Sequence, residues 1–213
     1  MMQERFHDVL SGYGAPVFIV LGNHDVGHVA RDPAREACYF AFTKQYPNLY
    51  YFPALSYSVD LGFAYLAMAN TNDLTAEDGA RIGRDLKGHK GWRIGFGHHV
   101  WRVYRDKKGE DRVRPWARKH GIRPHLWANG HAHLLQLVIE DGVWAATSGA
   151  GALLRERSQC PGSCGEGEVF GRSRPGYAVV ELDAERMTLT FKDFEGRVLY
   201  ERARPRSAPA PPK

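Results

Sequence analysis

The chain has 213 residues, of which 43% are hydrophobic and 25% charged, and its formal net charge is +5. This length and composition are typical of one globular domain with a sizeable core. Lys and Arg are scattered, with modest bunching over residues 102–118. We therefore interpret the positive charge as a solvated surface with some attraction for anions, and we predict no nucleic-acid partner.

The length of the apolar runs and the number of cysteines indicate whether the protein spans a membrane or is held together by disulfides. No run approaches the length of a membrane span, so we predict no membrane partner. The first residues show no signal peptide, and localisation stays open, export of a full-length form included. Three cysteines are too few for a disulfide framework. Cys160 and Cys164 either pair in an exported protein or are plain loop thiols, and Cys38 is interpreted as a small packed residue on a helix.

The first two thirds of the chain alternate between helix and strand patterns. Apolar residues recur at helical spacing over residues 2–10, and the run PVFIVL at residues 16–21 predicts a strand that is covered on both faces. Thr75 is expected to cap a helix, with Asp78 in a capping-box arrangement. The other predicted helices are residues 33–46, 75–86 and 113–120, and the other predicted strands are residues 49–52 and 56–61 (both short and antiparallel), 63–69, 92–96 and 124–128.

From residue 134 the pattern changes to hairpins. Predicted strands at residues 135–140 and 143–147 flank Asp141 and Gly142, which form a strong two-residue turn signal. The sequence thus predicts an α/β fold with a β-rich C-terminal part, in a single domain over residues 1–203 followed by a disordered Pro- and Ala-rich tail at residues 204–213. The last three strands are expected at residues 177–182, 187–194 and 198–203.

Three short polar motifs each follow an apolar run of strand character. They are GNHD at residues 22–25, GHH at residues 97–99 and GHAH at residues 130–133. In open α/β sheets, ligands bind beyond the carboxyl ends of the strands. Nitrogen and oxygen donors gathered there predict a metal site, although each motif by itself could be a polar turn.

The donor types narrow the choice of metal. Asn23 offers an amide oxygen, and His98, His131 and His133 offer imidazole nitrogens. This set suits Zn, Fe or Mn better than Ca or Mg. His131 and His133 either face one pocket, as residues two apart on a strand do, or straddle two ions from a loop.

Two neighbouring residues complete the candidate site. His24 could protonate a leaving group or stabilise developing charge, and Asp25 could orient its imidazole. His28 either lies near the site or is a polar residue in the first turn of the next helix, and the second interpretation is preferred. The remaining histidines are interpreted as surface or packing residues: His7, His89, His120 and His125.

The three motifs in this order resemble the calcineurin-like metallophosphoesterases. Four segments resemble the purple acid phosphatase branch of that family: PVFIVLGNHD at residues 16–25, GHHV at 97–100, GHAHLLQ at 130–136 and SGAG at 148–151. The resemblance spans roughly residues 6–151. It implies an α/β/β/α sandwich and a binuclear centre, Fe with Zn or Mn, whose bridging hydroxide attacks phosphorus.

The resemblance also implies a role for each matching residue. Asn23, His98 and His131 would bind the second metal ion, and His133 would bind the first. His24 would stabilise or protonate the leaving group. His99 would lie beside the site and contact phosphate.

The sequence departs from the family pattern in its carboxylates. The family has two earlier blocks, Asp-x-His and Gly-Asp-x-x-Asp, and neither occurs here. We therefore expect a fold truncated at the N-terminus, weak binding of a single metal ion, and an open edge on the strand at residues 16–21. A fragment of an active enzyme is the preferred explanation, and a natural variant that takes carboxylates from a partner chain is the alternative.

The expected function is hydrolysis of phosphoric monoesters, with a phosphorylated small molecule or a phosphoprotein as substrate. One alternative is a catalytically inactive metal-binding or interaction protein that keeps the fold. A phosphodiesterase is another, and a nucleic-acid phosphodiesterase would need a continuous basic groove. The sequence leaves the metal identity and the oligomeric state open.

Overall fold

The structure is a computed structural model that describes residues 2–27, 32–102, 112–151, 153–154 and 167–206. A π-helical turn, Gln3–His7, continues into α1, Asp8–Leu10. The longer helices are α2, Pro33–Thr43; α3, Ala76–Gly88; and α4, Val113–Lys119. Within the described residues, no helix combines the length and the apolar character needed to cross a membrane.

A seven-stranded sheet forms the centre of the molecule, with strand order β3-β4-β5-β6-β8-β7-β9. Strands β4, β5, β6 and β8 run parallel to one another, while β3, β7 and β9 are antiparallel to their neighbours. The bounds are β3, Tyr57–Asp60; β4, Ala64–Met68; β5, Trp92–Phe96; β6, Leu126–Asn129; β7, Leu135–Glu140; β8, Val143–Ser148; and β9, Glu168–Arg172. Of these strands, β9 was not predicted.

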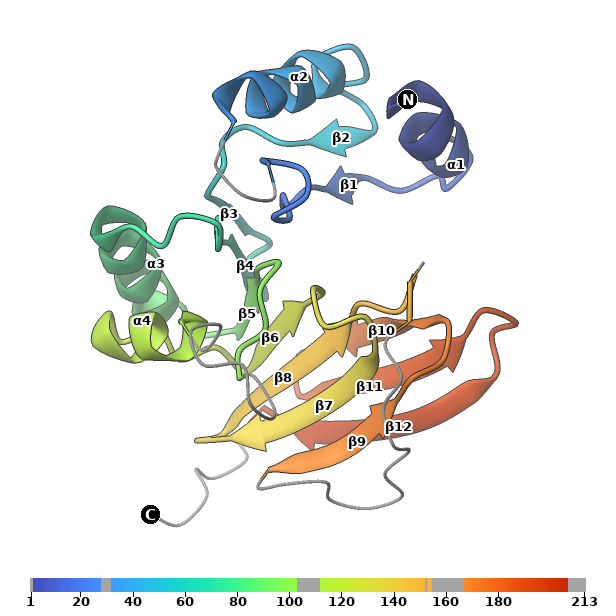
Figure 1. Ribbon diagram of the computed structural model, residues 1–213. Coiled ribbons are helices and arrows are strands. Elements are labelled where there is room, and N and C mark those ends of the chain that lie inside the picture. The colour runs from blue at the N-terminus through green and yellow to red at the C-terminus, as the bar shows by residue number, and fades with distance from the viewer. Residues whose placement is uncertain (1, 28–31, 103–111, 152, 155–166, 207–213) are drawn as a thin grey trace.

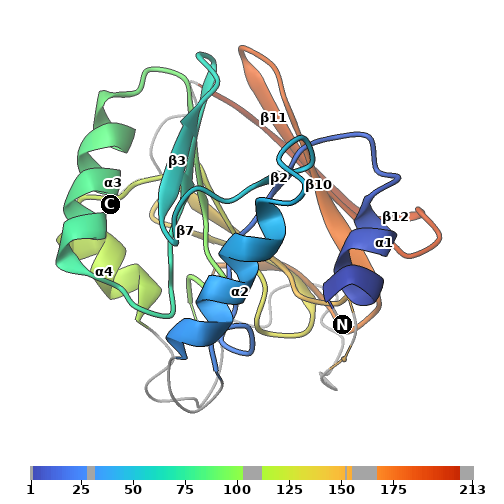
Figure 2. The same ribbon diagram turned by 90° about the horizontal axis from the view of Figure 1, so that it is seen from above.

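A second sheet consists of three antiparallel strands: β10, Gly176–Leu182; β11, Arg186–Asp193; and β12, Val198–Pro205. It lies on one side of the seven-stranded sheet, and α3 and α4 lie on the other side (Figures 1 and 2). Buried side chains of β7, such as Leu135 and Leu137, and of β11, such as Leu189 and Phe191, form the core between the two sheets. The predicted mixed α/β class with a β-rich C-terminal part is confirmed.

The other face of the seven-stranded sheet buries the apolar sides of two helices. Ile82 and Leu86 from α3 and Val113 and Trp116 from α4 pack with Trp127 of β6. The predicted cap of α3 is present, because the Thr75 side chain accepts a hydrogen bond from the Asp78 amide at 3.1 Å. The helices α3 and α4 connect β4 to β5 and β5 to β6, which are parallel neighbours, so β4, β5 and β6 end at the same edge.

The apolar run at residues 16–21 differs from its prediction. Only β1, Val17–Phe18, is a strand, and it pairs in parallel with β2, Tyr50–Tyr51, in a separate two-stranded sheet. The prediction of a strand buried on both faces is therefore wrong, and Phe18 is 37% exposed. The strand β2 was expected to be antiparallel and is parallel. Ile19 and Leu21 are nevertheless buried, because the chain continues inward against α2 and β3.

Several smaller predictions also changed or fell outside the described residues. Cys38 is exposed on α2 and not packed, because it faces away from the buried side of the helix. The strand β12 extends to Pro205, and Arg204 donates hydrogen bonds to the carbonyl oxygens of His125 and Gly142 at 3.0 and 2.9 Å. The predictions for His28, for Cys160 and Cys164 and for residues 207–213 lie outside the described residues.

Candidate metal centre

Two of the three polar motifs are joined by backbone hydrogen bonds at the shared edge of the sheet. They follow β5 and β6, which are parallel neighbours. The Gly97 amide donates to the Ala128 carbonyl and the Gly130 amide donates to the His98 carbonyl, each at 3.1 Å. The pairing of the strands thus continues into the loops, and it fixes the spacing between the two histidine motifs.

The third motif, which we call the GNHD turn (residues 22–25), reaches the same edge by side-chain contacts. The Asn72 amide, in the loop after β4, donates to the Leu21 carbonyl at 2.9 Å. The carboxylate of Asp25 accepts the Gly22 amide at 2.7 Å and closes the turn. A Cβ atom on Gly22 would lie 2.8 Å from the His98 ring. The turn is therefore packed directly against that imidazole, and only glycine leaves room for it.

Three of the predicted ligands converge at the edge. The Nε2 atom of His98 lies 2.8 Å from Oδ1 of Asn23 and 3.1 Å from Nδ1 of His131. Burial, and then the neighbouring His131, lower the pKa of His98 to about 4. A neutral imidazole keeps the lone pair that a metal ion requires.

His131 and His133 sit in a strained loop. Both have positive φ angles, 61° and 51°, which residues other than glycine rarely adopt. Such strain is concentrated at functional sites. A Cβ atom on Gly149, which belongs to the SGAG segment, would lie 3.0 Å from the His133 amide nitrogen, so Gly149 allows this loop to close against β8.

His133 belongs to the same loop as His131, but it is not among the three donors that lie within 3.1 Å of one another through His98. It follows His131 by two residues in the same loop, and its charge is one of the smaller causes of the lowered pKa of His98. Its Nδ1 atom is buried and has no hydrogen-bond partner among the residues that the structure describes. A buried ring nitrogen in that state costs free energy unless something binds it, and a metal ion is the partner that imidazole chemistry favours.

His99 lies beside the His98 and His131 rings and is held on two sides. It is 5% exposed. The Thr71 hydroxyl accepts the His99 amide at 3.0 Å and lies 2.9 Å from Nδ1, while Arg112 Nη2 lies 2.8 Å from Nε2. Burial, and then the charge of Arg112, lower the pKa of His99 to about 3. Its ring centroid is 4.7 Å from that of His131.

His24 is carried by the GNHD turn next to Asn23. Its carbonyl oxygen accepts a hydrogen bond from Arg35 at 3.1 Å, and its charge contributes to the lowered pKa of His98. Asp25, which was expected to orient the His24 ring, accepts hydrogen bonds from the Gly22 amide and from the Tyr39 hydroxyl. In this arrangement the Asp25 carboxylate fixes the backbone of the turn.

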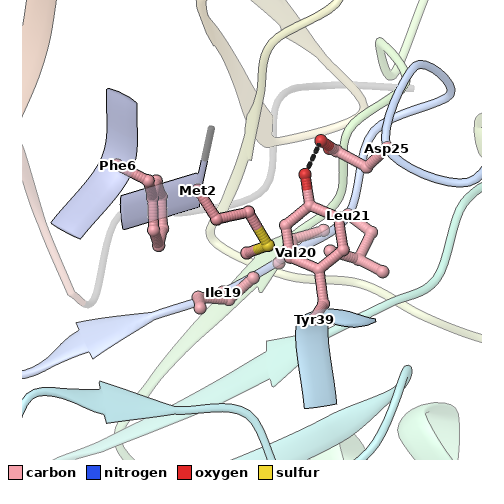
Figure 3. Close-up of a pocket in the computed structure, with 7 residues that line it drawn as sticks. All are labelled: Met2, Phe6, Ile19, Val20, Leu21, Asp25 and Tyr39. Atoms are coloured by element: carbon pink, nitrogen blue, oxygen red, sulfur yellow. Dashed lines mark hydrogen bonds between the residues drawn. The ribbon is translucent and has the colours of Figure 1, made fainter. Parts of the chain in front are cut away.

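Two cavities of about 310 Å³ each include residues of the candidate site in their walls. One is lined by His98 together with Phe18, Val20, Asn129 and Ser148, so the His98 ring borders a space of ligand size. The other is lined mainly by apolar side chains from the N-terminal helical segment and from residues 19–21, with the Asp25–Tyr39 pair at one end (Figure 3). Burial raises the pKa of Tyr39, so the hydroxyl remains a hydrogen-bond donor.

Comparison with known proteins identifies the family. The model of the calcineurin-like phosphoesterases matches residues 2–135. The chain belongs to the calcineurin-like phosphoesterase family.

Its relatives include tartrate-resistant acid phosphatase type 5 from the rabbit, Oryctolagus cuniculus, which is 27% identical over 244 aligned residues. The alignment covers 98% of this chain and 74% of the rabbit protein. The human protein of the same name is 26% identical over 243 residues, with 97% and 73% covered. These relatives support the purple acid phosphatase-like branch. Among solved structures, GAP50, the anchor in the inner membrane complex of Plasmodium, shares the fold with a TM-score of 0.67 at 18% identity, covering 94% of this chain and 70% of that one.

Members of this phosphoesterase family generally bind two metal ions. Among the described residues, no group of three or more His, Cys, Asp or Glu side chains is arranged to hold a metal ion. The donors that do converge are two imidazoles and one amide oxygen, from His98, His131 and Asn23, with the unsatisfied His133 nearby. This neutral set fits one Fe, Zn or Mn ion, and it contains no carboxylate to offset the repulsion between two ions.

Sequence reasoning missed three residues of this candidate site. Asn72 and Thr71 follow β4, so the rule that ligands gather at strand ends could have found them. Arg112 is the N-cap residue of α4 and lies 13 residues after His99 in the sequence. It lies within the bunched basic residues 102–118, but the sequence does not indicate which of these residues contacts His99.

Proposed function

We propose that this protein is a metal-dependent phosphoric monoester hydrolase of the acid phosphatase kind. The observation that carries the proposal is that Oδ1 of Asn23 and Nδ1 of His131 both lie close to Nε2 of His98, at 2.8 and 3.1 Å. These three donors come from two loops and a turn that are widely separated in sequence. Their convergence in a phosphoesterase fold supports a metal centre that acts on phosphate esters.

In this proposal Asn23, His98 and His131 would hold one metal ion. A second ion, for which His133 would be the first ligand, would also need carboxylate ligands that this set of donors does not contain. When bound, the metal ions supply an activated hydroxide as nucleophile and neutralise charge on the phosphoryl group. The chain itself holds the donors in place through the GNHD turn and the paired loops after β5 and β6. The metal ions are proposed to be Fe with Zn or Mn, because these ions accept imidazole and amide donors.

His24 is the proposed group at the leaving oxygen. It is carried by the same turn as the ligand Asn23, and the hydrogen bond from Arg35 to its carbonyl oxygen fixes its backbone. An imidazole there can donate a proton to the departing alkoxide, and general acid catalysis of this kind contributes about 10²–10⁴-fold in rate. The proposed substrates are phosphorylated small molecules or phosphoproteins.

A chromogenic phosphomonoester tests the proposal. The purified protein is assayed with added Fe, Zn or Mn, with His24→Ala and His131→Ala variants prepared in parallel to exclude contaminating phosphatases. We expect turnover that depends on the metal and falls in both variants. Equal turnover in wild type and variants, or none with any metal, contradicts the proposal. A parallel assay with a phosphodiester distinguishes a phosphodiesterase.

A non-catalytic role is the second candidate. The observation in its favour is that the converging donors are all neutral, with no carboxylate in the set. One protein with the same fold, GAP50, is described as an anchor. Under this alternative the protein binds a metal ion without turnover, so elemental analysis is positive while every ester assay is negative.

A further inference from the structure

Arg112 is an exposed residue at the N-cap position of α4, and its guanidinium group reaches back to the histidine cluster. Its Nη2 atom lies 2.8 Å from Nε2 and 3.3 Å from Nδ1 of His99. A guanidinium can only donate hydrogen bonds. His99 Nε2 therefore accepts from Arg112, and the ring proton is on Nδ1.

The rest of the network agrees with that tautomer. The Nδ1–H of His99 donates to the Thr71 hydroxyl oxygen at 2.9 Å, and the same oxygen accepts the His99 amide at 3.0 Å. Both ring nitrogens are thus used within the protein. His99 has no free proton to deliver to a substrate, and its function in this arrangement is to hold Arg112.

Arg112 differs from the neighbouring arginines in its charge balance. Arg102 and Arg114 both pair with Glu140, at 3.4 and 2.6 Å. Within the part of the chain that the structure describes, no carboxylate pairs with Arg112. Its positive charge is therefore available to an incoming anion.

The Arg112 guanidinium lies close enough to the predicted metal ligands to contact a bound phosphoryl group. The His99 ring lies 4.7 Å from the His131 ring and 5.1 Å from the His98 ring, measured between centroids. The guanidinium is thus one side chain away from the converging donors, which are all neutral. A phosphomonoester brings up to two negative charges to that place, and the planar guanidinium can bind two phosphoryl oxygens at once.

We propose that Arg112, positioned by His99, binds the phosphoryl group of the substrate and selects dianionic phosphomonoesters over monoanionic phosphodiesters. The inference rests on the proposed function for its biological meaning. It can be tested by equilibrium binding, because recognition of the phosphoryl group does not require turnover. Arg112 is a binding residue in this proposal, and His99 is a positioning residue.

Calorimetric titration with inorganic phosphate at pH 8 is the first test, performed on the full chain with and without added Zn²⁺. The variants are Arg112→Gln, Arg112→Lys and, as a matched control, Arg84→Gln, whose side chain on α3 is 74% exposed. Loss of a charge-assisted bidentate contact predicts a rise in the phosphate Kd of about tenfold or more for Arg112→Gln. Arg112→Lys should retain part of the affinity, and Arg84→Gln should bind as wild type.

Dimethyl phosphate, a monoanion, tests the selectivity. Its Kd should change less than that of inorganic phosphate when Arg112 is replaced by Gln. The positioning role predicts that His99→Phe weakens phosphate binding while His99→Gln, which keeps an acceptor, weakens it less. Circular dichroism of each variant confirms that it is folded, and the surface position of Arg112 keeps its own variants interpretable if the His99 variants unfold.

The outcomes separate this inference from the proposed function. Phosphate binding that depends on Arg112, without any ester turnover, supports the inference and contradicts the enzyme. An unchanged phosphate Kd in Arg112→Gln, an equal loss in Arg84→Gln, or no phosphate binding by the wild type overturns the inference. Turnover that persists in Arg112→Gln with the same KM overturns it while leaving the enzyme in place.

Discussion

The Tyr39 hydroxyl donates a hydrogen bond to the Asp25 carboxylate, and this contact connects α2 to the GNHD turn (Figure 3). The other oxygen of that carboxylate accepts the Gly22 amide at 2.7 Å. Asn23 and His24 lie between these two anchored residues. The Tyr39 side chain, on the helix that follows the turn, thus restrains the segment that carries the predicted ligand Asn23 and the predicted acid His24.

Replacing Tyr39 by Phe removes this restraint while keeping the ring. We expect a loss of about 1–2 kcal/mol in the free energy of unfolding, because a half-buried carboxylate loses a partner. Metal affinity should also fall, since Asn23 is less well fixed. Urea denaturation and metal titration measure the two effects. Tyr13→Phe, at a tyrosine that is 70% exposed, is the control and should change neither. A Tyr39→Phe variant as stable as wild type contradicts the restraint.

Replacing His131 by Ala tests the predicted metal ligands. Changes to groups that merely support a ligand weaken metal binding by about 10–100-fold, so loss of a direct ligand should cost at least about tenfold in affinity. Elemental analysis after dialysis and titration with Zn²⁺ provide the measurement. His120→Ala, at the C-terminal end of α4, should keep the wild-type metal content. Unchanged stoichiometry in His131→Ala would remove this residue from the set of ligands.

Replacing His24 by Ala should separate catalysis from metal binding. If the imidazole protonates the leaving group, the rate falls by about 10²–10⁴-fold while metal content stays close to wild type. A substrate with a good leaving group, such as a nitrophenyl phosphate, should suffer less than an alkyl phosphate. Equal losses of metal and rate would give His24 a structural role instead.

The free energy of unfolding should fall as the pH is lowered from about 6.5 to about 4. The contribution of His125 to this pH dependence can be measured separately. Burial, followed by the charges of Arg93 and Arg204, lowers its pKa from 6.5 to about 4. Between these values the unfolded chain binds a proton that the folded chain excludes, so unfolding becomes easier as the pH falls. His125→Asn should show a weaker dependence, by up to about one proton in the slope.

Urea denaturation at several pH values in this range measures that slope. His98 and His99 also have lowered pKa values, so they too make stability fall as the pH is lowered. They do so equally in the wild type and in His125→Asn. The comparison between wild type and His125→Asn therefore isolates His125. Identical slopes would mean that His125 titrates in the folded protein as it does in the unfolded chain.

Much of the fold was predictable because its signals are local. The apolar runs predicted β5 at residues 92–96, and they predicted the bounds of β7 and β8 to within one residue. Such predictions succeed because hydrophobic periodicity and turn residues act over short stretches of sequence. Asp141 and Gly142 have the positive φ angles, 51° and 77°, that the two-residue turn predicted. The strand β9 was missed because its sequence gives no equally regular pattern.

The run at residues 16–21 shows where local signals fail. Its composition predicts a strand with neighbours on both sides, but composition does not determine which neighbours are present. The partner is β2, two residues long, so only Val17 and Phe18 pair. Strand length is thus decided by the partner that the tertiary fold supplies.

By itself, the sequence determined the donor chemistry of the site: an amide and three imidazoles, each placed after an apolar run, with glycines that permit the tight turns. Only the tertiary structure decided which of them meet, because convergence depends on the parallel pairing of β5 and β6 and on the contact between Asn72 and Leu21. The same holds for the pairing of His99 with Arg112. Residue types fix which bonds are possible, whereas distance in space selects the ones that form.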